Sequence, residues 1–347
     1  MFQILFVSLS LNLSPFFFEL PTYEENEELF LKKVEERMQN SSIQKNIDSL
    51  LLMEKEKLSL NDSSFLEMKD HLYQRVLMGC TQKLISNEQT KRLVKVNKGS
   101  SRCIVTTIDG SKKRNPELIF QMIKNLEAIG YDGYVYFRIG GFPNPTGKEM
   151  QYAAVPYSFK IFLMLEAKNL GFPYVLWVDA RLMPLRSLDP IFSALKSNHA
   201  FLVKDKIMSR VNFTTFSLAE LEKITGINPL LNYRVATPVF GLDFAYPPVE
   251  KFINDYYACC ESGFPFFSVF PEEHVLSTIF AKYSKSYPLK SGLSNPFKHL
   301  WHYDDNNSLS QNLDFALKRH FFFFGLGNDS QYLLESLEME KKLQKKP

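Results

Sequence analysis

An aspartate at the end of a short apolar run is the first feature of this chain that suggests chemistry. Asp179 directly follows residues 174–178, with the sequence YVLWV. This run is too short for a helix and too apolar for an exposed strand, so it predicts a strand covered on both faces of a sheet. In open α/β sheets, ligands bind beyond the carboxyl ends of the strands. A carboxylate at that edge suits metal, phosphate or sugar chemistry.

Arg181 stands two residues after this aspartate. If the strand continues that far, Trp177, Asp179 and Arg181 share one face, because side chains alternate along a strand. A guanidinium suits phosphate oxygens, so the pair would bind a phosphorylated ligand. The alternative is a structural Asp–Arg pair that caps the strand.

Further helices and strands are predicted before and after this strand. Residues 157–170 place apolar side chains at helical spacing, and Gly171 stands where a helix commonly stops. Upstream, a strand over 102–108, a helix over 116–129 and a strand over 134–139 predict a βαβ unit. The segment after Asp179 continues to Leu188-Asp189-Pro190, where another helix is expected. This order predicts an α/β fold.

Downstream, the pattern predicts a strand over 200–204 and helices over 218–224, 249–260 and 272–283. A strand over 234–244 contains Pro238, so it should be bent or lie at an edge. With 31 Phe residues, the composition favours a Phe-rich core over a sugar-stacking cleft.

The chain divides into four predicted parts. Residues 1–20 are apolar and would form a signal or anchor, or else an extended segment packed on the body. Residues 21–98 are charged and helical in pattern, and they predict an appendage that serves as a stem, a dimerisation arm or an acceptor-side cap. The main domain spans 99–330, and a charged tail spans 331–347.

The net charge and the cysteine content limit the possible functions and locations of the protein. The net charge of +3 comes without a basic stripe, which argues against nucleic-acid binding. The four cysteines, Cys80, Cys103, Cys259 and Cys260, show no metal spacing and no disulfide framework. We therefore expect a reducing, cytoplasmic location, with membrane association if residues 1–20 provide it.

The segments PYSFK, VLWVDA and LDPIF together resemble the donor-site region of GT-A glycosyltransferases, in particular glycosyltransferase family 8. The resemblance covers residues 102 to 305 and rests on the order of these segments. In the family the strand ends in Asp-x-Asp, whereas this chain has Asp179-Ala180-Arg181. The resemblance implies a GT-A-like (Rossmann-like) mixed sheet flanked by helices, with the N-terminal helical appendage beside it.

The resemblance also implies an activity, the transfer of a sugar from a nucleotide-sugar donor to a glycan, lipid or protein acceptor. Asp179 would anchor the donor, and Arg181 with Lys160 would neutralise its diphosphate. The alternative for Lys160 is a solvated helix lysine. The predicted donor-binding residues are Thr106, Thr107, Asp109, Arg138, Tyr157 and Lys160. Ordinary turn chemistry is the alternative for the Thr106–Asp109 segment.

The resemblance places acceptor chemistry at the helix that begins near Glu272. Glu273 would address the acceptor, as a base if the reaction inverts. For Glu272 we favour a capping role, since acids stabilise helix N-termini. A divalent cation, Mn²⁺ or Mg²⁺, would be held by Asp179 and His302, although Arg181 replaces the second acid.

Two other functions stay open at this stage. The missing second acid would suit a catalytically silent relative that binds a nucleotide sugar or a glycan. An α/β phosphohydrolase with Asp179 as nucleophile is less favoured, because Arg181 stands where such enzymes want an acid. The sequence does not indicate an oligomeric state.

Overall fold

The computed structural model describes Leu52 and residues 91–108, 117–139, 158–213, 215–262, 264–266, 268, 270–286, 300–302 and 322–324. The predicted segment 1–20, most of the predicted appendage 21–98 and the tail 331–347 lie outside these residues. No helix among the described residues is long and apolar enough to cross a membrane.

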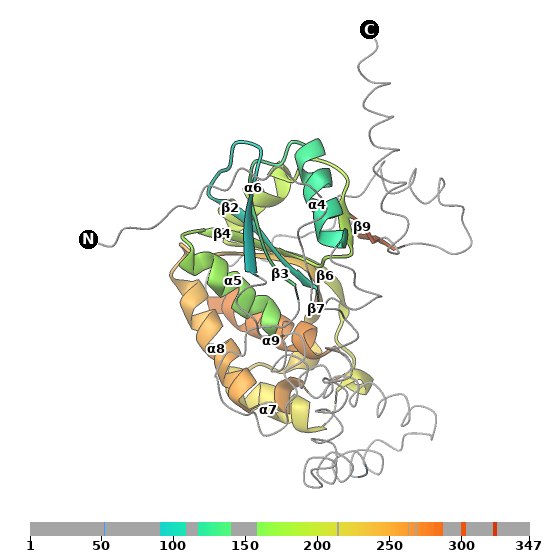
Figure 1. The fold of residues 1–347 in the computed structure, drawn as a ribbon. Helices are drawn as coiled ribbons and strands as arrows, with labels where there is room; N and C mark the ends of the chain where they lie inside the picture. Colours follow the sequence, from blue (N-terminus) through green and yellow to red (C-terminus); the bar gives the residue numbers. More distant parts are fainter. Residues whose placement is uncertain are drawn as a thin grey trace, which may run out of the picture.

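A mixed sheet of six strands forms the centre of the molecule (Figure 1). Its order is β1-β3-β2-β4-β7-β6. The three strands β3, β2 and β4 run parallel, and β1, β7 and β6 pair antiparallel with their neighbours. The strands are β1 Lys91–Val96, β2 Arg102–Ile108, β3 Gly133–Ile139, β4 Tyr174–Val178, β6 Ala200–Ile207 and β7 Tyr233–Asp243. The predicted α/β class with a mixed sheet is confirmed.

Helices cover both faces of this sheet, as Figure 1 shows. One face packs against α4 Glu117–Ala128 and α6 Asp189–Asn198. The other packs against α5 Phe159–Asn169, α8 Pro248–Ser262 and α9 Pro271–Ser286, with α7 Thr215–Thr225 beyond them. Short 3₁₀ turns are η2 Arg210–Asn212, η3 Pro229–Leu231 and η4 Phe264–Phe266. The predicted helices and strands of residues 102–283 are all present, with ends shifted by a few residues.

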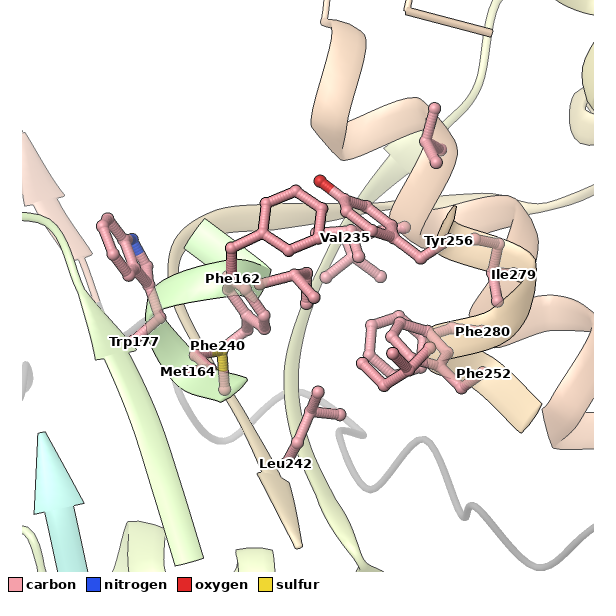
Figure 2. Packing of buried hydrophobic residues seen from close by; sticks show 14 of the residues in the cluster. Phe162, Met164, Trp177, Val235, Phe240, Leu242, Phe252, Tyr256, Ile279 and Phe280 are labelled. Carbon is pink, nitrogen blue, oxygen red and sulfur yellow. The ribbon is translucent and has the colours of Figure 1, made fainter. Parts of the chain in front are cut away.

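Aromatic side chains fill the layer between the sheet and α5, α8 and α9 (Figure 2). Phe240 of β7 and Phe252 of α8 are fully buried, and the Phe252 ring lies 4.5 Å from that of Phe280. Trp177 of β4 lies at the edge of this layer, 5.8 Å from the ring of Phe159. The abundance of phenylalanine therefore builds a core, as predicted.

Strand β7 runs through Pro238 without a break, and its pairing with β6 is irregular around this residue. Its register with β6 changes between the pairs Phe201↔Gly241 and Val203↔Ala236, so a longer piece of β7 opposes a shorter piece of β6. Such a bulge bends a strand and re-aims its groups. The predicted bend stays a prediction, which the irregular register around Pro238 supports. The edge alternative is wrong, because β7 lies between β4 and β6.

Two elements differ from the sequence expectation. Residues 91–96, assigned to the helical appendage, form β1 and pair with β3 in the main sheet. The lysines of KRLVKV made the segment look like part of a charged helix. Lysines also suit an edge strand, which is what the segment forms. A second sheet of three strands also appears, in the order β5-β9-β8. Its strands are β5 Leu182–Pro184, β8 Leu300–His302 and β9 Phe322–Phe324.

Candidate active site

Asp179 lies where β4 ends, at the carboxyl end of the parallel strands. Its N–H donates to the carbonyl of Pro238 at 2.9 Å, which ties it to the irregular stretch of β7. Its carboxylate oxygen Oδ1 accepts a hydrogen bond from Trp177 Nε1 at 2.6 Å. The Asp179 side chain keeps 30% of its surface exposed, so it is held in place and still accessible.

Lys160 is the buried cation beside this aspartate. Its Nζ lies 3.4 Å from Asp179 Oδ1 and 3.0 Å from Glu272 Oε1, and the side chain is 5% exposed. It also donates to the carbonyl and the hydroxyl of Thr237, each at 3.2 Å. The solvated-lysine alternative is therefore wrong. Helix α5 buries its first turns on the sheet, and this burial carries Lys160 inward with Phe159 and Ile161.

Charge pairing decides the protonation of this cluster. Burial by itself would lower the pKa of Lys160, but Asp179 and Glu272 outweigh it and hold the pKa above its ordinary value. Burial raises the pKa of Asp179, and Lys160 together with the Trp177 N–H opposes that rise. The ammonium thus stays charged and offsets the desolvation of two carboxylates.

The two acids at the start of α9 have different partners. Glu272 is buried, and besides Lys160 it accepts from Thr237 Oγ1 at 2.8 Å. Glu272 lies in the first turn of α9, as the favoured capping role requires, and its carboxylate also pairs with Lys160. Glu273 contacts the Thr237 N–H at 3.3 Å and Arg234 Nη1 at 3.4 Å. Burial and the nearby Glu272 charge raise the pKa of Glu273 to about 7.

Arg181 does not share the strand face with Asp179. Strand β4 ends at Val178, and Arg181 lies in a turn that Leu182 N–H closes by donating to the Asp179 carbonyl at 2.9 Å. The condition for a shared face, a strand that continues to Arg181, is therefore not met. Among the described ion pairs, the cation that contacts the Asp179 carboxylate is Lys160.

The predicted donor-binding residues of β2 and β3 lie near the same edge of the sheet. Thr107 pairs in register with Arg138, and its hydroxyl donates to the Arg138 carbonyl at 3.2 Å. Thr106 is fully buried, and its hydroxyl has no hydrogen-bond partner within the described part of the chain. Arg138 is buried and pairs with Glu166 of α5 at 2.7 Å. Its charge is thus matched inside the fold, while Nη1 has no acceptor among the described residues.

Three predicted residues are not placed by the structure. Asp109 and Tyr157 lie outside the described residues. His302 belongs to β8, which pairs with β9, but its side chain is not described. Its predicted role as a metal ligand therefore stays a prediction.

The side chains around Asp179 can be compared with the ligands that the predicted Mn²⁺ or Mg²⁺ would need. Among the described residues, no group of three His, Cys, Asp or Glu side chains could hold a metal ion. Asp179 Oδ1 already meets an N–H and an ammonium, which leaves its other oxygen as a ligand. A divalent cation needs several oxygen ligands. The described residues do not fit a complete metal site, and the Lys160 ammonium already pairs with Asp179 and Glu272.

Sequence reasoning missed Thr237 and Arg234 of this cluster, and it named Trp177 only as a neighbour of Asp179 on the strand face. Thr237 supplies its N–H, its carbonyl and its hydroxyl, Trp177 supplies its indole N–H, and Arg234 faces Glu273. One signal was available, since Lys160 interrupts an apolar helix face. A buried lysine requires a buried carboxylate.

Comparisons with known proteins give fold-level similarities of low score. No protein-family model matches the chain, and no curated protein matches it. The chain aligns with a crystal structure of a glycosyltransferase involved in the glycosylation of the major capsid of PBCV-1. The TM-score is 0.36 and the identity 10%, over 67% of this chain and 98% of that one. It also aligns with mouse xyloside xylosyltransferase 1 in its apo form. The TM-score is 0.25 and the identity 12%, over 61% of this chain and 73% of that one.

Proposed function

We propose that this protein is a glycosyltransferase that moves a sugar from a nucleotide-sugar donor to a glycan, lipid or protein acceptor, with Asp179 at the donor site. The observation that carries the proposal is the buried Lys160 ammonium, 3.4 Å from the accessible Asp179 carboxylate at the carboxyl end of β4. This is the edge at which open α/β sheets bind their ligands. A fixed cation there suits the diphosphate of a nucleotide sugar.

The chemistry requires charge control on both sides of the sugar. The bond between the anomeric carbon and the diphosphate oxygen breaks, and its electron pair leaves with the nucleoside diphosphate. The acceptor hydroxyl oxygen forms the new bond to that carbon and loses its proton. In this proposal Lys160 offsets the charge that develops on the diphosphate, and Asp179 orients the donor. Glu273, which titrates near neutral pH, faces the acceptor.

The same residues support a second candidate function, a nucleotide-sugar-binding protein without turnover. The observation in its favour is Arg181, which stands where the related motif has a second acid. This candidate predicts donor binding without release of nucleoside diphosphate.

Thermal-shift measurements test the donor site directly. The protein is mixed with UDP-, GDP- and CMP-sugars, each with Mn²⁺ and with EDTA. One donor at a hundredfold excess over its Kd should stabilise the protein by about 2.7 kcal/mol. This corresponds to a rise of roughly 4 °C or more in Tm for a chain of this size.

Asp179→Asn should remove this stabilisation while keeping the shape of the side chain. Asp189→Asn is the matched control, since Asp189 is an exposed aspartate that pairs with Arg102 at the amino end of the sheet. Release of the nucleotide, a nucleoside diphosphate from UDP- and GDP-sugars or CMP from CMP-sugars, in the presence of acceptor glycans then separates the transferase from the silent binder. The donor-site proposal fails if no member of the panel shifts Tm, or if Asp179→Asn retains the full shift.

A further inference from the structure

Glu273 is held loosely at both of its carboxylate oxygens. Oε1 accepts from the Thr237 N–H at 3.3 Å, and Oε2 lies 3.4 Å from Arg234 Nη1. Tight charge-assisted hydrogen bonds are about 2.7–2.9 Å long. The Glu273 side chain is only 15% exposed, so water does not replace these contacts. Its state therefore depends on a few protein groups.

Arg234 is fixed by an aromatic ring instead of by Glu273 alone. Its guanidinium carbon lies 3.8 Å above the centre of the Phe270 ring. Phe270 directly precedes α9, the helix that carries Glu273. A guanidinium stacked on an aromatic face keeps its orientation and its charge. The stack thus presents a permanent cation of defined direction to the carboxylate.

Charged groups on three of the described elements act on Glu273. Glu272 precedes it on α9, Lys160 lies on α5, and Arg234 belongs to β7. Lys160 in turn pairs with Asp179, which follows β4. The next residue, His274, contacts Ser268 Oγ through its ring nitrogen at 2.9 Å. Asp179 and Glu272 pair with the Lys160 ammonium, and among the described ion pairs Arg234 is the cation that contacts the Glu273 carboxylate. The charge of Lys160 also favours the ionised form of Glu273.

We propose that Arg234 is a positioning residue for Glu273: its guanidinium, stacked on Phe270 and 3.4 Å from Oε2, supplies the positive charge that favours the ionised carboxylate. Arg234 would thereby select the pH at which Glu273 can take a proton from an acceptor hydroxyl. This last step rests on the proposed transferase function. The effect on charge does not, and it can be measured without any substrate.

The first test follows folding stability against pH. Urea unfolding is measured from pH 5 to 9 for the wild type and for Glu273→Gln, and the difference between the two reports the titration of Glu273. Arg234→Gln, with and without Glu273→Gln, gives the same difference without the cation. We expect Arg234→Gln to move this titration to higher pH by about one to three pH units. Arg234→Lys, which keeps the charge and loses the stack, should shift it less.

Arg102→Gln is the matched control. Arg102 also pairs with a carboxylate, that of Asp189, and lies 5.3 Å from the ring of Phe192, at the far end of the sheet. It should leave the Glu273 titration unchanged. The proposal is overturned if Arg234→Gln leaves the midpoint where it is in the wild type, or if Arg102→Gln moves it equally. Should Arg234→Gln fail to fold, Arg234→Lys and Phe270→Leu decide the matter by the same measurement.

The second test uses the reaction. The pH profile of nucleoside diphosphate release should shift upward in Arg234→Gln in parallel with the stability titration, and Arg234→Lys should partly restore it. A stability shift in a protein that transfers no sugar supports the positioning role and counts against the transferase function. Transfer with an unshifted pH profile and an unshifted stability titration overturns the positioning role and leaves the transferase function in place.

Discussion

Replacing Lys160 by methionine should destabilise the protein more than any surface substitution. The side chain is 5% exposed, and its ammonium contacts Asp179 at 3.4 Å and Glu272 at 3.0 Å. Methionine matches the length of the lysine stem but leaves the buried Glu272 without its cation. The mutation tests whether the cluster is held together by this one charge.

The magnitude follows from the distances. At an effective dielectric of 20, a unit-charge pair at these separations interacts by roughly 5 kcal/mol. The desolvation of the charges cancels much of this, and breaking a buried pair by removing one partner costs about 3–5 kcal/mol. Since a domain has about 5–15 kcal/mol of stability in total, the loss should be plain in unfolding curves.

Urea unfolding followed by tryptophan fluorescence measures the effect, because Trp177 donates to Asp179 within the cluster. Adding Glu272→Gln to Lys160→Met should recover about 2 kcal/mol, since the uncompensated buried charge is then gone. Lys223→Met is the control, because Lys223 is 74% exposed and its pair with Glu220 should contribute less than about 1 kcal/mol. A loss below about 1 kcal/mol for Lys160→Met, or no recovery in the double variant, would refute the reasoning.

Three further predictions concern pH, metal and packing. The pKa of Glu273 is raised from 4.5 to about 7, so the folded state binds the extra proton. The contribution of this proton to the free energy of unfolding is therefore fully present below pH 4.5. It is lost as the pH rises through 7, and the loss is about 3 kcal/mol. Glu273→Gln should abolish this pH dependence of the free energy of unfolding in urea. Because Lys160 supplies a fixed cation at Asp179, EDTA should leave most of the donor-induced rise in Tm; a rise that vanishes in EDTA would show that a divalent cation binds the diphosphate instead. Phe252→Ala should cost about 3–5 kcal/mol, since Phe252 is fully buried and packs 4.5 Å from Phe280; calorimetry that finds less than about 1 kcal/mol would contradict the packing shown in Figure 2.

Local pattern was sufficient for most of the main domain. The strand over 102–108 and the strand over 174–178 have the ends that their apolar runs predicted. Such short apolar runs predict their strands well, because a strand covered on both faces buries all of its consecutive apolar residues. Strand β1 was missed, because its lysines stand at an edge where one side meets water. The sheet formed by β5, β9 and β8 was missed as well, because its strands are short and far apart in sequence.

Sequence alone marked Asp179 as the residue at the end of a buried strand, and it offered Lys160 and Glu273 as candidates on separate helices. Only the tertiary structure decided which charges meet. Helix α5 turns Lys160 inward, and the irregular stretch of β7 around Pro238 contains Thr237, which contacts it, while the turn after Val178 takes Arg181 off the strand. Partners such as Glu272 and Lys160 are 112 residues apart, and no local periodicity encodes their contact. Pairing of buried charges is a property of how the helices and the sheet pack, since each charge is stable only beside an opposite one.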